Sequence, residues 1–457
     1  MLTRIEIDGF KTFEDFGIDI GPLLVVLGPN ATGKSNLFDA IRFLSNLASK
    51  DLRSAVKGLR GEPHELFRIQ PDGQPGTKMS FAVELLLESK ATDPWGTQVQ
   101  ITHNRVRYEV DIERRMDEKG TERLVVVKEE AIPINAKDDR LFGSSFHAPS
   151  KQFRDTFMRY SRKTPWLTTE LEGVNGKPSF KIFQDGRAGR FLLAEAAEAT
   201  VLSSITTTEY RHLYAIREEM NSWKFLQLDP AVMRLPSSKL DDETLKSDGS
   251  NLATVLARIQ METASSTQPQ GVLKDIAADL SSLISGIISL QVRDDRVNKR
   301  YEVNLSVREG YALSSRIVSD GTLRILALLT LLHDPRQRGL ICFEEPENGI
   351  HPYRLKTLIN RLRELVTKPW NTDISFEEPF SQILMNSHSP VVLSSLEEGE
   401  KMFSDMVSTV SPTEQEVARK TRLRPVRDQG ELLPGEKQNY VSAFEVKNYL
   451  DSVDRAG

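Results

Sequence analysis

The sequence predicts an α/β fold in which a parallel sheet, covered by helices, carries a phosphate-binding loop. Residues 23–27 form a continuous apolar run, Leu-Leu-Val-Val-Leu, as expected of a strand buried on both faces. A glycine-rich loop follows at once, and an amphipathic helix follows the loop. A short apolar run at residues 340–343 and a second short strand segment at residues 382–385, Gln-Ile-Leu-Met, alternate with helical patterns, which is typical of parallel strands.

Residues 1–130 supply the N-terminal half of this fold. A helix is expected at residues 36–47, because apolar side chains recur there at helical spacing. Residues 106–112 alternate apolar and charged side chains, as in a strand with one buried face. After a turn, residues 124–127 return as a second strand, so we expect an antiparallel hairpin.

Residues 131–290 interrupt the pattern and predict an inserted, mainly helical domain. Helical spacing occurs within it at residues 190–199, 207–220, 252–262 and 272–284. The α/β pattern resumes in residues 291–400, which we assign to the C-terminal half of the same domain. Residues 401–457 form a C-terminal tail for which the sequence suggests no role. The fold is therefore expected to close from two segments that lie far apart in the chain.

Composition indicates a globular protein and excludes several classes. The chain has 457 residues, of which 39% are hydrophobic and 27% are charged. No apolar stretch approaches the ~20 residues that span a bilayer, and the N-terminus lacks the layout of a signal peptide, so no membrane partner is expected. The single cysteine, Cys342, suits a reducing cytoplasm, and no Cys/His metal-binding spacing occurs. Because the net charge is −5, contact with DNA would require a local basic patch.

The glycine-rich loop fits the phosphate-binding pattern G-x-x-x-x-G-K-[ST]. Its residues are Gly28, Pro29, Asn30, Ala31, Thr32, Gly33, Lys34 and Ser35. The two glycines allow the backbone to curl so that N–H groups converge at a helix N-terminus, where partial positive charge favours phosphate. We expect Lys34 to reach the β- and γ-phosphates and the Ser35 hydroxyl to ligate Mg²⁺. The loop predicts a nucleoside triphosphate but does not specify the reaction.

Two acidic residues follow the apolar run at 340–343. Carboxylates at the end of a buried parallel strand lie at the edge of the sheet where ligands bind. We expect Glu344 to support Mg²⁺ and Glu345 to orient or deprotonate an attacking water. The alternative is an ordinary strand that ends in a solvated acidic turn. Cys342, inside the run, is expected to be a small buried apolar residue.

Two further segments each have a functional and a structural interpretation. Ser319, Asp320 and Gly321 form a small-residue turn before a helix, and this turn is either an anion site or an ordinary helix N-cap. His388 follows the apolar run at 382–385. It is either a hydrogen-bonded structural residue or a sensor of the γ-phosphate, since histidine can donate to an anion near neutral pH.

The order of these motifs resembles a known family. Residues 9–13, Gly-Phe-Lys-Thr-Phe, and residues 27–41 around the phosphate loop closely resemble the N-terminal signature of SMC, RecF and OLD-type ABC ATPases. Three later segments resemble further motifs of this family. Residues 319–324 are similar to the variant signature of compact "AAA family" relatives from prokaryotic antiphage defence. Residues 343–352 are similar to the Walker B motif and D-loop, and residues 386–390 are similar to the segment of the switch histidine. The resemblance covers residues 1–115 and 290–395.

The resemblance implies an ABC-type P-loop ATPase head that binds ATP and Mg²⁺ and hydrolyses ATP. Residues 28–35 and Asn36 of one protomer would hold the phosphates, with Lys11 near the nucleotide. Ser319, Asp320 and Gly321 of a second protomer would close over the γ-phosphate. Such sites form only in a head-to-tail homodimer or a higher oligomer.

The resemblance also implies the roles of individual side chains in hydrolysis. Ser35 and Glu344 would hold the metal ion, whereas Lys34, Glu345 and His388 would act on the γ-phosphate and on the attacking water. Binding energy at the γ-phosphate would then drive closure of the dimer, and hydrolysis would reopen it.

The sequence departs from the family pattern in several ways. Glu344 replaces the usual aspartate, which moves the metal ligand by one methylene, and Asp320 replaces a glycine of the signature. The Q-loop is not evident from the pattern, and Gln70 is the candidate. No sustained heptad repeat is present, so an SMC-like coiled-coil arm is not expected.

A basic and aromatic stretch at residues 151–166 is a candidate for contact with nucleic acid. However, Phe153, Phe157 and Tyr160 fall at helical spacing, which favours a core stripe on a helix whose basic side is solvated.

Three functions fit the motifs. We favour a switch or motor ATPase that regulates a separate effector, a nuclease or toxin, in antiphage defence or DNA maintenance. No D-x-D cluster of a TOPRIM-type nuclease follows His388, so a cutting site is expected on a partner protein. The second possible function is that of an ABC transporter subunit. Segment 9–13 and the large insertion argue against it. A P-loop phosphotransferase or GTPase is the third, and no N-K-x-D guanine motif occurs.

Overall fold

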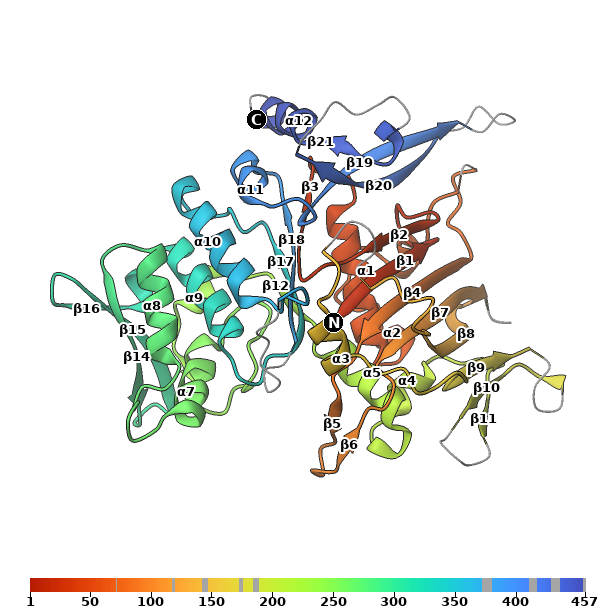
Figure 1. The fold of residues 1–457 in the computed structure, drawn as a ribbon, viewed down its shortest axis with the longest axis horizontal. Coiled ribbons are helices and arrows are strands. Elements are labelled where there is room, and N and C mark those ends of the chain that lie inside the picture. Colours follow the sequence, from red (N-terminus) through yellow and green to blue (C-terminus); the bar gives the residue numbers. More distant parts are fainter. Residues whose placement is uncertain are drawn as a thin grey trace.

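The computed structural model describes residues 1–70, 72–116, 120–141, 147–171, 176–183, 189–371, 380–410, 417–428 and 436–454. A mainly parallel sheet runs through the middle of the molecule, with an antiparallel sheet on one side and a helical region on the other (Figure 1). In the part of the chain described here, no helix combines the length and apolar character needed to span a membrane.

The parallel sheet contains the three strands expected from the apolar runs. Its order is β12-β17-β18-β3-β19-β20-β21. Its first five strands run parallel to one another, and they are β12 (Lys224–Leu226), β17 (Gly339–Glu344), β18 (Ser381–Ser387), β3 (Leu23–Leu27) and β19 (Lys401–Val410). β20 (Val417–Arg427) turns back against β19, and the short β21 (Val441–Ser442) ends the sheet. The carboxyl ends of β3, β17 and β18 therefore meet at one edge.

The antiparallel sheet has the order β11-β10-β9-β8-β7-β4-β1-β2. The predicted hairpin is confirmed as β7 and β8, which pair along their whole length. The strands are β1 (Leu2–Asp8), β2 (Phe16–Asp19), β4 (Lys78–Leu86), β7 (Arg105–Met116), β8 (Glu122–Pro133), β9 (Leu167–Glu170), β10 (Ser179–Ile182) and β11 (Arg190–Leu193). β5 (Lys90–Thr92) and β6 (Gln98–Gln100) form a separate small hairpin.

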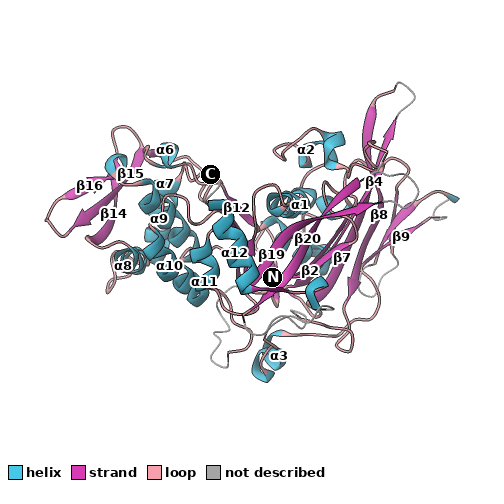
Figure 2. Cartoon of the chain, turned by 90° about the horizontal axis from the view of Figure 1, so that it is seen from above, coloured by secondary structure: helices cyan, strands magenta, loops and turns pink. Residues whose placement is uncertain are grey.

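Helix α1 (Lys34–Leu47) lies between the two sheets (Figure 2), and the parallel sheet separates the interior into two cores. Leu24 and Val26 of β3 face α1 and the antiparallel sheet. Leu23, Val25 and Leu27 face the helical region on the other side. Because side chains alternate along a strand, burial of both faces explains the continuous apolar run at residues 23–27.

The helical region covers the second face of the parallel sheet. Its helices are α6 (Pro230–Met233), α7 (Leu252–Thr263), α8 (Leu273–Leu283), α9 (Asp320–Leu332) and α10 (Pro352–Leu365). The strands β13 (Ser237–Ser238), β14 (Ile287–Asp295), β15 (Arg300–Val307) and β16 (Ala312–Ser314) form a small sheet at its outer end (Figure 1). Helix α9 is buried on almost every side, as its apolar sequence predicts.

The helical insertion expected at residues 131–290 starts later in the chain and is joined to both sheets. β9, β10 and β11 extend the antiparallel sheet. The stretch at 190–199, expected as a helix, begins with β11, because pairing with β10 outweighs the helix propensity of its alanines. α4 (Val201–Ser204) and α5 (Arg211–Asn221) then pack towards α1, and β12 joins the parallel sheet.

The C-terminal tail is also part of the parallel sheet. Met402 of β19 pairs with Val26 of β3, and β19 then continues past the end of β3 beside the glycine-rich loop. α11 (Pro390–Ser395) and α12 (Ala443–Asp454) pack at this end of the sheet. The described part of this tail, residues 401–410, 417–428 and 436–454, thus supports the loop, a role that the sequence did not reveal.

Candidate nucleotide-binding site

The glycine-rich loop and the acidic strand end meet at the carboxyl edge of the parallel sheet. β18 lies between β3 and β17 and pairs with both, so the loop after β3 and the carboxylates after β17 are two strands apart. The Ser35 hydroxyl lies 3.4 Å from Oε2 of Glu344, although 309 positions separate the two residues. The structure therefore brings together the two segments that the sequence predicted to share one ligand.

The loop has backbone angles that only a few residue types adopt easily. Gly28 and Gly33 have φ values of +152° and +90°, and Ala31 also has a positive φ, 63°. A Cβ atom at Gly33 would lie 2.0 Å from Oγ1 of Thr421, and one at Gly28 would lie 2.5 Å from the Ser404 carbonyl oxygen. The glycines are thus required both by conformation and by the close approach of β19 and β20.

Lys34 is a buried cation held by the loop itself. Its Nζ donates hydrogen bonds to the carbonyl oxygens of Gly28 and Pro29, at 2.6 and 2.5 Å. Burial lowers the pKa of Lys34 to about 8, although Glu345 and Glu347 act in the opposite direction. Within the described residues no carboxylate lies within ion-pair distance of Nζ. A buried ammonium without an anionic partner is suited to receive phosphate.

The N-terminus of α1 adds unsatisfied donors to the same place. Gly33 is the N-cap residue, and no side chain caps the helix. The first N–H groups of a helix have no partner within it, and they carry partial positive charge. Together with Lys34 they form an anion-binding corner at the end of β3.

The two carboxylates at the end of β17 occupy different environments. Glu344 lies near three polar groups: Ser35 Oγ at 3.4 Å, Asn386 Nδ2 at 3.5 Å and Gln227 Nε2 at 3.5 Å. Glu345 has a positive φ of 51°, and its N–H donates to Oδ1 of Asn386 at 2.9 Å. This unusual backbone angle turns the chain sharply at the sheet edge.

The side chain of Glu345 is oriented by its neighbours. Nδ2 of Asn348 donates to Oε2 of Glu345 at 2.6 Å. The other oxygen, Oε1, lies 4.0 Å from Nδ1 of His388. Glu345 thus stands between an amide donor and an imidazole, and it is 40% exposed.

His388 faces a second carboxylate, Glu347, which the sequence interpretation did not single out. Nδ1 of His388 lies 3.3 Å from Oε1 of Glu347, and that oxygen accepts hydrogen bonds from the His388 N–H and the Ser387 hydroxyl. Nδ1 of His388 and Oε2 of Glu347 are buried and have no hydrogen-bond partner of suitable geometry among the described residues. Such unsatisfied atoms are typical of a site that a ligand completes.

The turn at residues 319–321 is a helix N-cap, because the Ser319 hydroxyl accepts a hydrogen bond from the Thr322 N–H. Asp320, which replaces a glycine of the family pattern, forms an ion pair with Arg234. Gly321 packs against the Gly349 carbonyl oxygen, which lies 1.9 Å from the place where a Cβ would stand. In the part of the chain described, no hydrogen bond or ion pair joins this turn to residues 28–35.

Lys11 and Asn36 belong to a polar network that supports the loop. Lys11 Nζ donates to Asp39 Oδ2 at 2.6 Å and to the Arg60 carbonyl at 2.8 Å. Arg60 in turn donates to the Ser35 carbonyl at 2.7 Å and to Asp39 at 3.1 Å. Asn36 Nδ2 donates to the Thr12 hydroxyl at 3.0 Å. The charge of Lys11 is thus already paired with Asp39. The contact of Lys11 with a nucleotide stays a prediction.

Sequence reasoning missed several residues of this site. Gln227, directly after β12, lies beside Glu344, whereas Gln70 is exposed in a turn where its N–H donates to the Gln74 carbonyl. The hydroxyls of Ser404 and Thr421 both donate to the Thr32 carbonyl and fix the loop from the C-terminal strands. Because β12 has only three residues, its pattern is too short to predict.

The aromatic and basic stretch at 151–166 is used mainly for packing. Helix α3 (Lys151–Phe157) buries Phe153 completely against Phe157 and Phe380. Tyr160 lies beyond the helix and donates its hydroxyl to Asp139 at 2.6 Å. The preferred interpretation as a core stripe therefore holds for Phe153.

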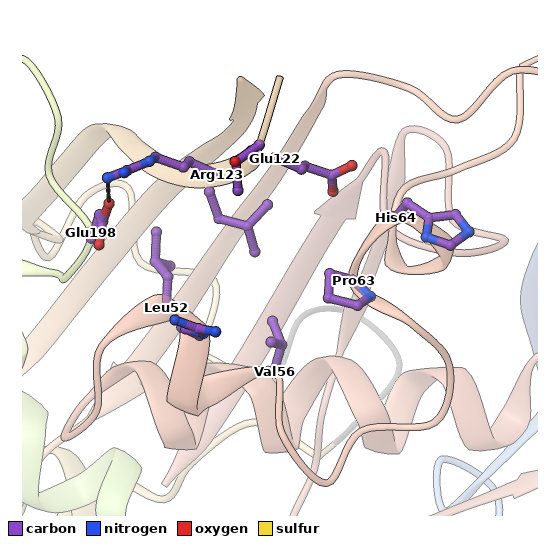
Figure 3. Close-up of a pocket in the computed structure, with 10 residues that line it drawn as sticks. Leu52, Val56, Pro63, His64, Glu122, Arg123 and Glu198 are labelled. Carbon is purple, nitrogen blue, oxygen red and sulfur yellow. Dashed lines mark hydrogen bonds and ion pairs between the residues drawn. The ribbon is translucent and has the colours of Figure 1, made fainter. Parts of the chain in front are cut away.

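A separate surface hollow of about 490 Å³ lies between α2 (Leu52–Ala55) and the start of β8 (Figure 3). Its charged side chains have both signs, and Arg123 forms an ion pair with Glu198 at 2.8 Å. It contains none of the phosphate-loop residues.

Comparison with known proteins agrees with this architecture. A family model described as "AAA domain" matches residues 4–185, and one described as "AAA domain, putative AbiEii toxin, Type IV TA system" matches residues 178–394. The chain is 34% identical to the chromosome partition protein Smc of Burkholderia pseudomallei over 113 residues, which are 23% of this chain and 9% of that protein. It is 21% identical to Smc of Mesomycoplasma hyorhinis over 333 residues, which are 67% of this chain and 32% of that protein.

The two AAA-domain models together match residues 4–394, and the chain is similar in sequence to Smc proteins. It spans at most about a third of the length of these Smc proteins. Among solved structures, an Smc head bound to the C-winged helix domain of ScpA gives a TM-score of 0.48 at 12% identity, covering 93% of this chain and 98% of that one. The Smc head of Pyrococcus yayanosii gives 0.47 at 11% identity, covering 99% of each chain.

Proposed function

We propose that this chain binds ATP with Mg²⁺ at the carboxyl edge of the parallel sheet and hydrolyses it. The observation that carries the proposal is the meeting of Ser35 with Glu344, beside the buried and unpaired Lys34. Lys34 and the first N–H groups of α1 bind and orient the β- and γ-phosphates. Similarity to the AAA-domain family models supports the same reaction.

The residues at this edge fit a magnesium ion. Mg²⁺ in nucleotide sites is held by one or two protein oxygens together with phosphates and waters, so a large cluster of carboxylates is not needed. Ser35 Oγ and Glu344 Oε2 supply such a pair, and Asn386 and Gln227 lie within 3.5 Å of the same carboxylate. When bound, the ion would neutralise charge on the phosphate oxygens. The longer Glu344, in place of aspartate, still reaches Ser35.

The hydrolytic step is assigned to Glu345 and His388. Glu345 holds the attacking water and accepts its proton, because Asn348 fixes Oε2 and leaves Oε1 directed towards His388. His388 is placed to donate to the γ-phosphate, with Glu347 setting its orientation. Both groups come from neighbouring strand ends, so a small shift at the edge would change both together.

A second copy of the chain completes the site. Ser319 and Asp320 are exposed at the N-terminus of α9, whereas Gly321 is buried, and among the described residues no hydrogen bond or ion pair joins this turn to the phosphate loop of its own chain. In a head-to-tail dimer this turn closes over the γ-phosphate of the other protomer. The ion pair with Arg234 cancels the charge of Asp320, which would otherwise repel that phosphate.

Closure and reopening of this dimer would regulate a separate effector. The printed description of one matching family model refers to a toxin of a type IV system, and a solved Smc head carries a bound domain of ScpA. We therefore place the chain as the ATP-dependent switch of a nuclease or toxin in antiphage defence or DNA maintenance, with the chemistry of that effector on a partner protein.

The deciding experiment compares Glu345→Gln with Glu398→Gln, an exposed glutamate remote from the site. Glu345→Gln should bind ATP normally, lose phosphate release by about 100-fold or more and accumulate a dimer in the presence of ATP. Glu398→Gln should behave as wild type. Normal phosphate release by Glu345→Gln would remove the catalytic assignment of that residue.

A further inference from the structure

The hollow of Figure 3 has the size and the lining of a small-molecule site. Its volume of about 490 Å³ falls within the range of about 300–1,000 Å³ that ligand pockets usually have. Its walls are α2, a 3₁₀ turn at Pro63–Leu66 and the start of β8. Leu52, Val56 and Leu124 form an apolar floor that is packed on the core around α1. The apolar body of a ligand would therefore be contacted from three sides.

The charges at the rim of this hollow leave one cation without a partner. Glu122 accepts a hydrogen bond from Arg114 at 3.3 Å, and Arg123 pairs with Glu198 at 2.8 Å. Both carboxylates that line the hollow are thus matched by arginines. By contrast, Arg53 on α2 is exposed and forms no ion pair or side-chain hydrogen bond among the described residues. The unmatched charge of the hollow is therefore positive, and its complement is an anion.

An apolar floor beside one unmatched cation describes an amphipathic anion. The floor would bury a hydrocarbon body, and the Arg53 guanidinium would bind a carboxylate at one end of it, since its planar fork matches the two carboxylate oxygens. The imidazole of His64, on the 3₁₀ turn, is a second donor at the rim. The site is concave and has walls on three sides, which suits a small molecule better than a flat lipid surface.

We propose that the hollow of Figure 3 binds a small amphipathic carboxylate and that this binding strengthens the binding of ATP. The second half of the proposal rests on the proposed function. The link is the segment at residues 57–62, which joins α2 to the 3₁₀ turn. Val56 and Pro63 flank this segment, one at each end, and both line the hollow. Arg60, inside the segment, donates to the Ser35 carbonyl at 2.7 Å.

This connection gives a physical route from the hollow to the ATP site. A molecule that contacts both ends of segment 57–62 restricts the movement of the residues between them. Arg60 is then held on the Ser35 carbonyl, in the first turn of α1, where the phosphates and the magnesium ion are placed. ATP therefore loses less conformational freedom of the protein when it binds. Because such coupling is reciprocal, ATP should strengthen binding of the carboxylate by the same factor.

The test is isothermal titration calorimetry of the full chain with decanoate as the probe. Arg53→Gln removes the unmatched cation, and Val56→Phe fills part of the hollow. The matched control is Arg308→Gln, which removes an exposed arginine after β15 that forms no ion pair among the described residues. Octanoate tests the length of the apolar body, and decyltrimethylammonium tests the sign of the charge. Circular dichroism checks the folding of every variant, and the decanoate titration is repeated with Lys34→Ala.

Wild type and Arg308→Gln should bind decanoate equally, and about tenfold more tightly than octanoate, because two further CH₂ groups are buried. Arg53→Gln should bind decanoate about tenfold more weakly, since a charge-assisted contact is lost, and Val56→Phe should bind it more weakly still. Saturating decanoate should tighten ATP binding by wild type about fivefold and leave ATP binding by the two hollow variants unchanged.

Decanoate binding to Lys34→Ala would support the site whether or not the proposed ATP site is correct. Equal decanoate affinities of Arg53→Gln and Arg308→Gln would overturn the site, and so would equally tight binding of decyltrimethylammonium. Binding to phosphatidylglycerol vesicles without binding of decanoate would also overturn it, because the ligand would then be a lipid surface. An ATP affinity that decanoate does not change would overturn the link to the ATP site. Failure of wild type to bind ATP without decanoate would instead refute the proposed function.

Discussion

The outer face of the antiparallel sheet and the edge that holds Lys34 treat positive charge in opposite ways. On the sheet, Arg107 lies between Glu6 and Glu109, at 2.6 and 2.5 Å, and Lys128 reaches Glu109 at 2.6 Å. At the nucleotide edge, Lys34 Nζ donates hydrogen bonds to the carbonyl oxygens of Gly28 and Pro29, and Lys34 forms no ion pair among the described residues. Paired cations hold the strands together, whereas unpaired ones mark places where a ligand is expected.

The pKa values show the same contrast. On the sheet, burial would raise the pKa of Glu6, but hydrogen bonds from Arg107 and Arg4 lower it, so the carboxylate is stabilised in its charged form. At the edge, burial lowers the pKa of Lys34 to about 8, and the nearby carboxylates offset this only in part. The charged form of Lys34 is therefore less stable than that of an exposed lysine, and a bound anion would stabilise it.

The largest effect is expected from removing the unpaired cation. Lys34→Ala should weaken ATP binding by about 100-fold or more, because a buried charge-assisted contact to phosphate is lost. Titration with a fluorescent ATP analogue measures this. Binding within threefold of wild type would break the proposed link between an unpaired cation and a ligand.

A smaller effect is expected from Arg234, a cation that is paired with Asp320 in the turn proposed to contact the second protomer. Arg234→Ala should leave ATP binding by the monomer unchanged but lower turnover about tenfold, because the carboxylate of Asp320 then repels the incoming phosphate. Replacing that carboxylate in Arg234→Ala/Asp320→Gly should restore part of the loss. Light scattering with ATP reports dimer formation, and an equal loss of ATP affinity by the monomer would contradict the role in the second protomer.

The dependence of ATP affinity on pH sharpens the comparison further. Below pH about 8 the unliganded Lys34 is already charged, so ATP binding takes up no proton at this group. Above that pH the side chain is neutral before binding, and the affinity should fall about tenfold per pH unit. Circular dichroism at each pH controls for unfolding. A constant affinity between pH 7 and pH 10 would show that Lys34 does not meet the phosphates.

The smallest effect is expected on the sheet. Arg107→Ala removes contacts to Glu6 and Glu109 and should lower the free energy of unfolding by about 1 kcal/mol, because the pairs are partly exposed. The dissociation constant for ATP should stay within twofold of wild type. A loss of ATP binding in this variant would mean that the sheet and the nucleotide edge are not separate in function.

The sequence was informative wherever a strand or loop is defined by its own residues. The segments at 23–27, 340–343 and 383–385 are apolar because both of their faces are buried, and this pattern predicted three strands of a parallel sheet. The glycines of the loop predicted its curvature for the same reason, since their backbone angles are needed locally.

The sequence was uninformative where structure depends on distant pairing. β12 is three residues long and becomes a strand only beside β17, so the sequence did not point to Gln227, which follows it. β11 was expected to be helical because its alanine-rich continuation favours a helix. The hydroxyls of Ser404 and Thr421 reach the Thr32 carbonyl only because β19 pairs with β3 across the whole fold.

The most direct measurement is an anomalous difference map from crystals grown with Mn²⁺ and a non-hydrolysable ATP analogue. The ion should appear between the Ser35 hydroxyl and Glu344, in contact with the β- and γ-phosphates, with Lys34 turned away from the Pro29 carbonyl towards the same phosphates. An ion and a nucleotide bound elsewhere, with Lys34 still closed on the loop, would contradict the account.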